Sequence, residues 1–522
     1  MTEIQPERTI LVAVGAHYDL LIIGGGINGA GIARDAAGRG LSVLLVEKDD
    51  LASATSAWSS KLIHGGLRYL EQYAFRLVAE ALAEREILLD IAPHLVKPLR
   101  FVMPHVPELR PRWMIRAGLF LYDHLGRRAT AAGPREIRLP GSHGIDLRVP
   151  PYHAALKPEF EHGFIYSDCR VDDARLVLIN ALGAAENGAA VLTRTHCTSG
   201  KRIPQGWAIR LRREGGSEFS VTARAVVNAA GPWVKQTLND CLMQPSSDNV
   251  RLVKGSHIIV PRLYAGDHAY ILQNDDRRVV FMIPYLDSLT LIGTTDVPVA
   301  GVEEVPQASE EEIAYLCRAV SRYLVQPLVP AQVIASYAGV RPLYDDGSEN
   351  PSAVTRDYTL RLDADSGQSP VLSIFGGKIT TYRRLAEHAL EKLGPWFPDI
   401  RPPWTASRPL PGGESGGTLP DAARWHALPP DLLTDLHARH GWRVSHVLHG
   451  VQTRADLGAD FGANLYAREI DYMVAHEWAM TGDDVLYRRS KAGLHMTATQ
   501  CDAVRNYVAA HPAASGVSAD MR

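Results

Sequence analysis

The sequence lacks the features that mark several protein classes. Its 522 residues include only five cysteines, which lie far apart and form no Cys-x-x-Cys pair, and this pattern argues against a disulfide framework or a zinc cluster. No apolar run approaches the roughly 20 residues that a membrane-spanning helix needs. A formal net charge of -3 gives no overall attraction to nucleic acid. We therefore expect a reducing compartment, no membrane span and no nucleic-acid partner.

Motifs for metal or nucleotide-hydrolysis chemistry are missing too. The stretch His476–Met480 has methionine where H-E-x-x-H requires a second histidine, and no G-x-x-x-x-G-K-[ST] loop occurs. Carboxylates in Gly293–Asp296 and Asp172–Ala174 are expected to cap turns. The sequence therefore predicts no metal site.

The N-terminal stretch Thr9–Ala16 faintly resembles a signal peptide, but it is short and continues directly into an apolar run. We expect residues 1–17 to be an N-terminal extension. Because 522 residues exceed the size of one hydrophobic core, two or three domains are expected.

Three strand-to-helix units recur along the chain, and in each an apolar run ends in glycine. They are Tyr18–Asp50, Ala223–Val234 and Pro370–Gly394. The first unit continues into a second apolar strand, which makes a βαβ unit. This pattern predicts an α/β fold with a Rossmann-like domain.

The segments between these units are rich in β-branched and aromatic residues separated by turn residues, which predicts an inserted antiparallel sheet. A Pro- and Gly-rich linker and helical spacing follow Gly394. The expected boundaries are 18–97, 164–240 and 365–395 for a discontinuous cofactor-binding domain, 98–163 and 241–364 for a β-rich substrate domain, 396–418 for the linker, and 419–522 for a helical C-terminal domain.

A dinucleotide site is predicted in the first unit. Gly24, Gly26 and Gly29 fit G-x-G-x-x-G after a strand and at the start of a helix, where bare backbone lets amides approach a pyrophosphate. Glu47, at the end of the next strand, suits hydrogen bonds from ribose hydroxyls. Packing alone is the alternative use of these glycines.

The segment after Glu47 favours FAD over NAD. A hydroxyl-rich loop follows, and Thr55, Ser59 and Ser60 could hold the pyrophosphate side of a flavin. Gly376 and Gly377 start a helix in the third unit, which would bring amide dipoles to the pyrimidine end of the flavin ring.

Together these stretches closely resemble the FAD-dependent glycerol-3-phosphate dehydrogenases, which share a D-amino-acid-oxidase-like fold. The matching stretches include IIGGGINGAGIARDAAGRGLSV, SSKLIHGGLRYLE, YSDCRVDDARLVL, KGSHIIVP and FGGKITTYRRLAEHALEKL. They run in order from about residue 18 to 394, and HEWAM and DDVLYRRSKAGL extend the likeness into the C-terminal domain. Two departures are the N-terminal extension and Ala57-Trp58, where smaller polar residues are common in the flavin loop.

The resemblance implies oxidation of sn-glycerol 3-phosphate to dihydroxyacetone phosphate by hydride transfer to FAD, with electrons passing to ubiquinone or menaquinone. It also implies a homodimer attached peripherally to the cytoplasmic face of the inner membrane. An oxidase that uses O₂, a non-catalytic flavin-bound sensor and an amine-oxidising flavoenzyme are the alternatives.

The resemblance also carries site residues. His257, His64, Arg341 and Lys378 are the expected catalytic residues, and Arg68, Tyr69 and Arg356 are expected to bind substrate. The expected cofactor-binding residues are Gly24, Gly26, Gly29, Glu47, Thr55, Ser59, Ser60, Leu62, Gly65, Gly231, Gly376, Gly377 and Thr380.

The cations suit a phosphate, since guanidinium groups bind it in two-pronged fashion. For the proton acceptor we favour His257, because imidazole titrates close to neutrality, with His64 as the rival. Finally, Glu108–Arg128 combines arginines with Trp113 and Phe120. Such a helix could lie on an anionic membrane, or it could simply pack on the core.

Overall fold

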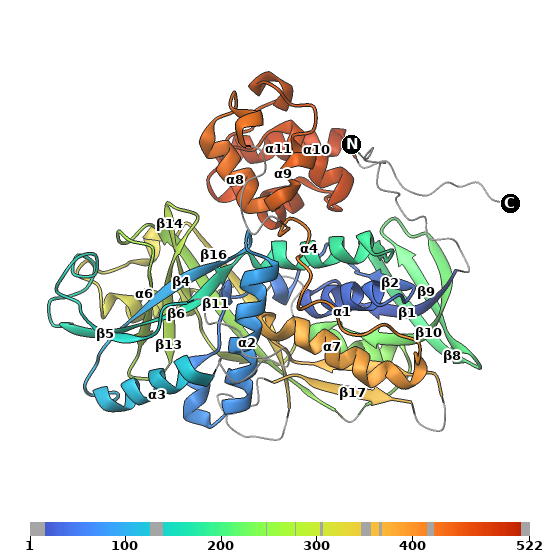
Figure 1. The fold of residues 1–522 in the computed structure, drawn as a ribbon, viewed down its shortest axis with the longest axis horizontal. Coiled ribbons are helices and arrows are strands. Elements are labelled where there is room, and N and C mark those ends of the chain that lie inside the picture. Colours follow the sequence, from blue (N-terminus) through green and yellow to red (C-terminus); the bar gives the residue numbers. More distant parts are fainter. Residues whose placement is uncertain are drawn as a thin grey trace.

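The computed structural model describes residues 16–125, 139–246, 248–276, 278–302, 306–345, 357–364, 368–414 and 422–512 (Figure 1). Several predictions fall outside the described residues. They concern most of the 1–17 extension, Arg127, Arg128, Arg356, the end of the 396–418 linker and the last ten residues.

A largely parallel sheet forms the core of the first domain. Its order is β17-β18-β10-β1-β2-β7; in addition, β9 pairs with the first half of β10, and β8 pairs with β9. The strands are β1 (His17–Ile23), β2 (Val43–Val46), β7 (Ala190–Leu192), β8 (Thr195–Ile203), β9 (Gly206–Arg213), β10 (Glu218–Asn228), β17 (Thr359–Asp363) and β18 (Val371–Phe375). β18, β10, β1, β2 and β7 run parallel, which confirms the Rossmann-like prediction.

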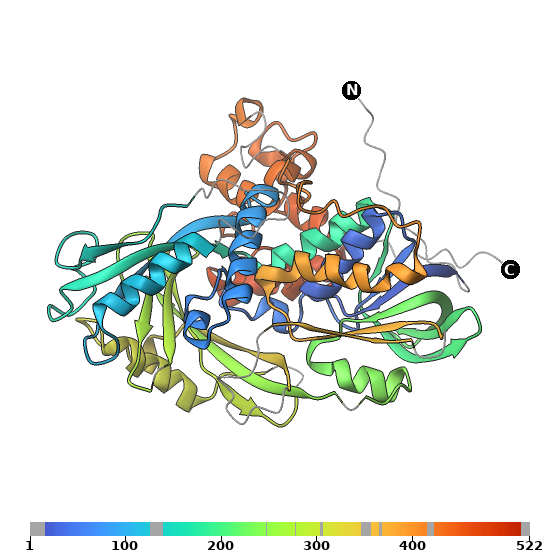
Figure 2. The ribbon, with the colours of Figure 1, turned by 60° about the horizontal axis from the view of Figure 1, so that its bottom comes forward.

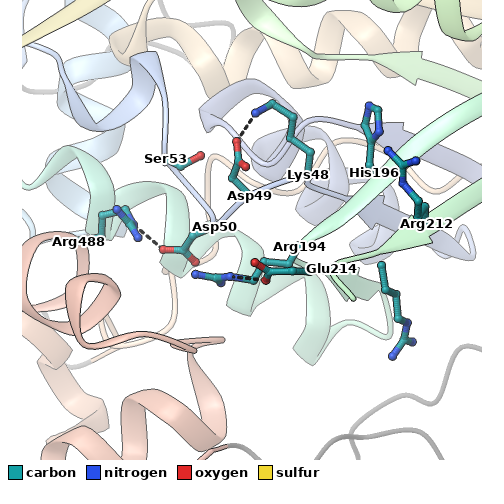
Figure 3. A pocket seen from close by; sticks show the side chains of 10 residues that line it. Lys48, Asp49, Asp50, Ser53, Arg194, His196, Arg212, Glu214 and Arg488 are labelled. Atoms are coloured by element: carbon teal, nitrogen blue, oxygen red, sulfur yellow. Dashed lines mark hydrogen bonds and ion pairs between the residues drawn. The ribbon is translucent and has the colours of Figure 1, made fainter. Parts of the chain in front are cut away.

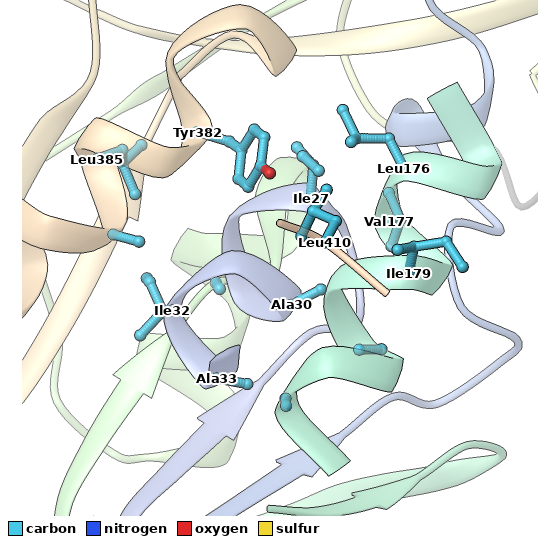
Figure 4. Packing of buried hydrophobic residues seen from close by; sticks show 14 of the residues in the cluster. Ile27, Ala30, Ile32, Ala33, Leu176, Val177, Ile179, Tyr382, Leu385 and Leu410 are labelled. Carbon is cyan, nitrogen blue, oxygen red and sulfur yellow. The ribbon is translucent and has the colours of Figure 1, made fainter. Parts of the chain in front are cut away.

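Three helices cover one face of this sheet. α1 (Ile27–Gly38) lies between α4 (Asp173–Glu186) and α7 (Tyr382–Leu393), as Figure 4 shows. Small residues on α1 permit the close approach, and a β-carbon at Gly31 would lie 2.6 Å from the Tyr382 ring. Ile27 and Ala30 are buried in the resulting core.

The second sheet has the order β15-β11-β14-β13-β12-β4-β6-β3, with β16 and β5 added. Its strands are β3 (Leu62–Ile63), β4 (Val96–Pro104), β5 (His143–Asp146), β6 (His162–Val171), β11 (Val250–Pro261), β12 (Ala269–Gln273), β13 (Val279–Tyr285), β14 (Leu289–Gly293), β15 (Val297–Val299) and β16 (Ala335–Tyr344). Pairing is antiparallel except between β12 and β4, so the sheet is mixed rather than purely antiparallel.

Two strands near predicted domain boundaries join a different sheet from the one that the boundaries imply. The boundaries are residue 164, the predicted start of the second cofactor-domain segment, and residue 364, the predicted end of the substrate domain. β6 begins near residue 164 but pairs with β4 along its whole length, from Val96↔Val171 to Pro104↔Gly163. β17 ends near residue 364 yet pairs with β18 in the first sheet. Apolar periodicity identifies a buried strand but not the sheet that it joins, which explains the difference.

Three longer helices accompany the second sheet. They are α2 (Phe75–Ile91), α3 (Arg112–Leu125) and α6 (Glu310–Ser321). α3 lies on the side of the molecule away from the C-terminal helices (Figures 1 and 2). None of the helices in the described residues combines the length and the apolar character needed to cross a bilayer.

The C-terminal domain is helical, as predicted. Its helices are α8 (Pro430–His440), α9 (Val444–Val447), α10 (Ala467–His476), η13 (Asp484–Arg489) and α11 (Ala498–Ala510). A fully buried ion pair joins it to the first domain, with Arg175 Nη1 on α4 lying 2.6 Å from Glu477 Oε2. Arg489 adds a second such pair with Asp50.

The described part of the linker packs closely on the first domain. The Trp404 indole donates to the Asp35 carbonyl at 3.2 Å, and Arg34 donates to the carbonyls of Arg408 and Pro409 at 3.1 Å. Leu410 is buried in the α1 core (Figure 4). A high Pro and Gly content therefore gives an extended segment here, but one that is held in place.

Candidate active site

A cavity of about 700 Å³ is lined by residues of both sheets. It brings together most of the predicted site residues from segments far apart in the chain. The predicted residues that line it are Gly24, Gly26, Glu47, Thr55, Ser59, Ser60, Leu62, His64, Arg68, Tyr69, Gly231, His257, Arg341, Gly376, Gly377, Lys378 and Thr380. Gly29 and Gly65 lie outside the lining, and Arg356 is outside the described residues.

The turn from β1 to α1 forms one end of the cavity. Gly24 has φ +113°, and a β-carbon there would lie 2.5 Å from the Ala229 carbonyl oxygen. A β-carbon at Gly29 would lie 1.9 Å from the Gly24 carbonyl oxygen. Gly29, the third glycine of the fingerprint, therefore packs the helix closely against the turn. Gly24 and Gly26, the first two glycines, present bare backbone to the cavity.

The Glu47 carboxylate connects this turn to the end of β2. Its Oε2 accepts from the Gly25 amide at 2.6 Å and its Oε1 from the Asp49 amide at 2.9 Å. Burial raises the pKa of Glu47 above its usual range, against the effect of these amides. The carboxylate is thus fixed in orientation at the cavity wall, where it can also accept a ligand hydroxyl.

The hydroxyl-rich loop uses its side chains inside the protein. Thr55 Oγ1 donates to the Val340 carbonyl at 2.6 Å, and Ser59 Oγ donates to Asp173 at 2.7 Å. Ser56, which the sequence analysis passed over, accepts from the Ile27 amide at 3.0 Å at the start of α1. These bonds fix the loop against β16 of the second sheet and against the first residues of α4 and α1, so it offers a rigid wall to a ligand.

His64, Gly65 and Gly66 form a turn, called the HGG turn below, and the side of it that faces away from the cavity packs on buried side chains. The Gly65 amide donates to Tyr122 Oη at 2.9 Å, and a β-carbon on Gly65 would meet Leu82 and Tyr122 at 2.7 Å. Tyr122 Oη donates to Asp168 Oδ2 at 2.7 Å. The buried Arg85 also donates to Asp168, with Nη1 2.8 Å from Oδ1. Gly65 is therefore a packing position, and Gly66 is the glycine that reaches the cavity.

Arg341 lies at the cavity wall with a carboxylate partner. Its guanidinium pairs with Asp296, and Nη2 donates to Thr294 Oγ1 at 3.0 Å. Both partners line the cavity as well. The expectation that Asp296 only caps a turn is therefore wrong, because its carboxylate orients the guanidinium.

Lys378 comes from the third glycine unit, between Gly377 and the short helix η8 (Ile379–Thr381). Its Nζ lies 3.7 Å from the centre of the Tyr69 ring, which is within the range of a cation–π contact. Both residues line the cavity, as does Arg68.

His257 is almost fully buried on β11. Its Nε2 lies 2.9 Å from Ser60 Oγ, and its ring stacks on Tyr337 with centroids 4.8 Å apart. Nδ1 has no hydrogen-bond partner among the described residues. Burial holds the pKa of His257 well below its usual range, and the nearby Arg341 and Lys61 lower it further. The imidazole is therefore neutral at physiological pH.

A buried ion pair supports the Ser59-Ser60 segment. Lys61 Nζ lies 2.8 Å from Asp173 Oδ1 and donates to the Ala57 carbonyl at 2.9 Å. Ser59 binds the other oxygen of Asp173, and Tyr337 Oη donates to the Ser59 carbonyl at 2.8 Å. The position of Ser60, and through it of His257, thus depends on this pair.

His64 occupies a less buried position on the same cavity. Its amide donates to Thr380 Oγ1 at 3.2 Å, and its ring meets Phe281 edge-on with centroids 6.3 Å apart. The hydrogen bond to Thr380 connects the HGG turn with the third glycine unit.

A smaller pocket of about 420 Å³ adjoins the Glu47 end of the cavity (Figure 3). Its charged residues pair mostly with one another. Lys48 pairs with Asp49, Arg194 with Glu214 at 3.1 Å and Arg488 with Asp50 at 2.5 Å. Of these pairs, Arg488–Asp50 joins the Glu47 end of the first domain to η13 of the C-terminal domain.

Comparison with known proteins agrees with this geometry. The sequence profile of the FAD-dependent oxidoreductases matches residues 19–383. A glycerol-3-phosphate dehydrogenase of Pseudomonas aeruginosa is 56% identical over 488 residues, which span 92% of this chain and 93% of the relative. The chain belongs to the FAD-dependent glycerol-3-phosphate dehydrogenase family.

Other members of this family extend the comparison. A D-erythritol 1-phosphate dehydrogenase of Brucella abortus is 51% identical over 92% of this chain and 95% of its own length. A crystal structure of the Bacillus halodurans glycerol-3-phosphate dehydrogenase in complex with FAD has a TM-score of 0.68 at 25% identity and covers 94% of this chain and 93% of its own. Residues 403–518 match the C-terminal domain of alpha-glycerophosphate oxidase.

The residues present fit FAD, the cofactor of this family. The glycine turn, Glu47, Lys378 and His257 all line this one cavity. Two buried polar atoms on its wall, Asn28 Oδ1 and His257 Nδ1, have no hydrogen-bond partner among the described residues. Buried polar atoms are usually paired, so a ligand with polar groups is the natural partner of both.

Several residues of the site carry no local sequence signal. Asp173, Lys61 and Tyr337 hold the loop beneath His257, and Tyr122 holds the HGG turn. Each side chain is ordinary for its own element, and its role depends on a partner more than 50 residues away. The SSKLIHGGLRYLE and YSDCRVDDARLVL stretches of the family resemblance contain Lys61, Asp168 and Asp173, but they do not show which partners these side chains bind.

Proposed function

We propose that this protein oxidises sn-glycerol 3-phosphate to dihydroxyacetone phosphate and passes the electrons to a membrane quinone. The convergence of Arg68, Arg341 and Lys378 on one cavity with His257 carries this proposal. Three cations from separate elements suit a phosphate dianion better than a single carboxylate does. The 56% identity with the Pseudomonas aeruginosa dehydrogenase supports the same substrate.

The cations would bind the phosphate and fix the substrate carbon that is oxidised. Asp296 orients the Arg341 guanidinium, so the direction in which this cation faces the cavity is set. When bound, FAD supplies the acceptor for the hydride. Holding the substrate in the reactive geometry contributes several kcal/mol to lowering the barrier.

The proton of the substrate hydroxyl needs an acceptor, and His257 is our candidate. Its depressed pKa keeps the imidazole neutral and able to accept a proton. A phosphate dianion beside Arg341 would offset the cationic neighbour that lowers this pKa, and so bring the base closer to the working pH. His64 is the rival, and comparing His257→Ala with His64→Ala for loss of turnover distinguishes the two.

A second substrate is favoured by a specific observation. The Brucella abortus relative, a D-erythritol 1-phosphate dehydrogenase, is 51% identical over 92% of this chain. Glycerol 3-phosphate and erythritol phosphate share a terminal phosphate and a neighbouring alcohol, and they differ by one hydroxylated carbon. The three cations would bind either phosphate, so this choice depends on the space beyond the oxidised carbon.

Anaerobic addition of substrate to the purified yellow protein tests the proposal. Rapid loss of flavin absorbance with sn-glycerol 3-phosphate, and a much slower loss with D-erythritol 1-phosphate, is the expected result. The reverse order would assign the tetritol phosphate, and no bleaching with either would overturn the proposal. Arg341→Ala is expected to raise KM for the phosphate ester far more than it lowers kcat.

We also propose that α3 and the neighbouring helix ends attach the protein to the cytoplasmic face of an anionic membrane. Ile115, Leu119 and Tyr122 of α3 are buried, whereas Trp113 is 72% and Phe120 57% exposed. Tyr73, beside α3, is 81% exposed. Exposed aromatics next to arginines are typical of a helix that lies in the headgroup layer.

This surface adjoins the substrate end of the cavity. Tyr69 and Gln72 line the cavity from η2 (Leu67–Gln72), and the exposed Tyr73 follows directly. A quinone approaching from the membrane would therefore enter beside the redox centre. Steady-state assays with a quinone analogue against oxygen test the acceptor, and fast peroxide formation would favour an oxidase instead. The homodimer stays a prediction.

Sedimentation with vesicles that contain anionic lipid tests the membrane proposal. The double variant Trp113→Glu, Phe120→Glu is expected to lose binding at low salt and to keep its soluble activity. Trp442→Glu is the matched control, because Trp442 is also exposed but lies on the C-terminal domain. Equal sedimentation of both variants would overturn the proposal.

A further inference from the structure

Two of the five cysteines lie in direct contact. Cys197 Sγ on β8 is 3.3 Å from Cys241 Sγ at the end of the short helix η5 (Thr237–Cys241). The other three are buried in separate parts of the molecule, Cys169 in the α1 core, Cys317 on α6 and Cys501 on α11. This is therefore the one thiol–thiol contact among the described residues.

Both thiols belong to the wall of the cofactor cavity. Cys197 is buried and Cys241 is half-buried, and Cys241 Sγ also donates to the Cys197 carbonyl at 3.2 Å. The neighbouring wall residues are Thr195 and His196 of β8 and Trp233 of the Gly231 turn. The pair thus lies where two walls of the nucleotide end meet.

We propose that Cys197 and Cys241 form a redox-active pair that closes to a disulfide when a hydroperoxide attacks it. The geometry carries the proposal, since the two sulfurs are already in contact at 3.3 Å, and a disulfide bond needs them at about 2.05 Å. Cys241 is the more accessible sulfur and is the one that reacts first.

The chemistry balances with hydrogen peroxide as the oxidant. The Cys241 thiolate attacks one peroxide oxygen and the O–O bond breaks. Hydroxide departs, and Cys241 becomes a sulfenic acid. The Cys197 sulfur then attacks the sulfenic sulfur, the S–O bond breaks, and water leaves as the S–S bond forms. Overall, two thiols lose two electrons and two protons, and one peroxide becomes two waters.

The electrostatics of the pair support this order of events. Cys197 is the more deeply buried thiol, so it keeps its proton. Once Cys241 ionises it no longer donates to the Cys197 carbonyl, and Cys197 Sγ donates to Cys241 Sγ. This hydrogen bond lowers the pKa of Cys241 and raises the pKa of Cys197. A lowered pKa increases the thiolate fraction, which is the reactive form.

A disulfide at this place would fasten β8 to η5. Residues of both elements line the cavity, so the cross-link would keep these two parts of its wall from separating. We expect the oxidised protein to release FAD more slowly than the reduced protein.

The test treats the reduced holoenzyme with hydrogen peroxide, blocks the remaining thiols and maps them by mass spectrometry. The expected result is the loss of two of the five thiols in a peptide that links Cys197 to Cys241, with full recovery by a dithiol reductant. In Cys197→Ala the reaction should stop at a sulfenic acid on Cys241, which dimedone traps. Cys317→Ala is the matched control and should form the cross-link normally.

Oxidation spread over all the thiols without a Cys197–Cys241 peptide would overturn the proposal. Labelling of Cys241 that is no faster than labelling of Cys317 would do the same. Equal rates of FAD release before and after cross-linking would overturn the role in retaining the cofactor. These measurements count thiols and bound flavin, so they stand apart from the identity of the substrate.

Discussion

The Gly65 amide donates to Tyr122 Oη at 2.9 Å, and the same hydroxyl donates to Asp168 at 2.7 Å. One phenol thus links the turn that carries His64 to a buried carboxylate on β6. The HGG turn cannot shift without breaking this bond. The position of His64 and Gly66 at the cavity wall therefore depends on Tyr122, which does not line the cavity.

Tyr122→Phe removes this link while keeping the ring. We expect it to lower the free energy of unfolding by about 1–3 kcal/mol, because the Gly65 amide and the Asp168 carboxylate both lose a buried hydrogen-bond partner, and to weaken FAD binding. Urea unfolding and flavin titration measure the two effects. Tyr166→Phe is the control, since Tyr166 is equally buried and stacks on Phe101 with centroids 5.3 Å apart. Equal losses in both variants would contradict the assigned role.

Gly29→Ala is expected to abolish FAD binding. The new β-carbon would lie 1.9 Å from the Gly24 carbonyl oxygen, so the turn that carries Gly24 must move. Gly118→Ala in α3 meets nothing within 4 Å and should instead stabilise the protein by up to about 1 kcal/mol through helix propensity. The ratio of flavin to protein absorbance after purification checks the first prediction, and a normal ratio for Gly29→Ala would refute it.

Ser60→Ala removes the hydrogen-bond partner of His257 Nε2. We expect kcat to fall by about tenfold, which corresponds to about 1.4 kcal/mol, because the imidazole loses its orientation. KM should change little, because the cations that bind the substrate phosphate are unaffected. Ser60→Thr keeps the hydroxyl and should restore most of the rate. Failure of Thr to rescue, or a change confined to KM, would count against the positioning of His257 by Ser60.

Glu477→Gln tests the ion pair between the first and C-terminal domains. Removing the carboxylate leaves Arg175 buried without its partner, which costs about 3–5 kcal/mol at neutral pH. Glu214→Gln, whose side chain is 70% exposed in its pair with Arg194, should change the stability by less than about 1 kcal/mol.

The same variant makes a prediction about acid. Burial by itself would raise the pKa of Glu477, but Arg175 and His440 lower it overall in the folded state. An unfolded glutamate takes up a proton near pH 4.3, so the stability from this pair is complete above that pH and is lost as the pH falls below it. We therefore expect unfolding midpoints of Glu477→Gln to depend less steeply on pH between about 5 and 3 than those of the unsubstituted protein. Equal slopes would contradict the lowered pKa.

Much of the fold could be predicted from the sequence, because the strongest signals are local. Apolar runs that end in glycine mark β1 and β18, and the fingerprint around Gly24 and Gly26 places the nucleotide end. Other features depend on partners that are distant in the chain. Periodicity cannot say that β6 joins the second sheet, where it pairs with β4, nor that β17 joins the first.

The candidate site divides in the same way. Residues such as His257 and Lys378 lie in motifs that a family resemblance can carry, and they line one cavity. Asp296 was expected to cap a turn, but from the loop between β14 and β15 it pairs with Arg341 of β16. Lys61 and Asp173 lie 112 residues apart, so only the folded chain brings this ion pair under the loop.

The segment from Trp404 to Leu410 crosses the outer side of α1 with its own side chains embedded there. A protease or a shortened gene that ends the chain before residue 404 would uncover the first helix of the cofactor domain as well as delete the helical domain. The two parts are therefore inseparable as building blocks, and any chimera that exchanges the C-terminal helices must carry this strap with them.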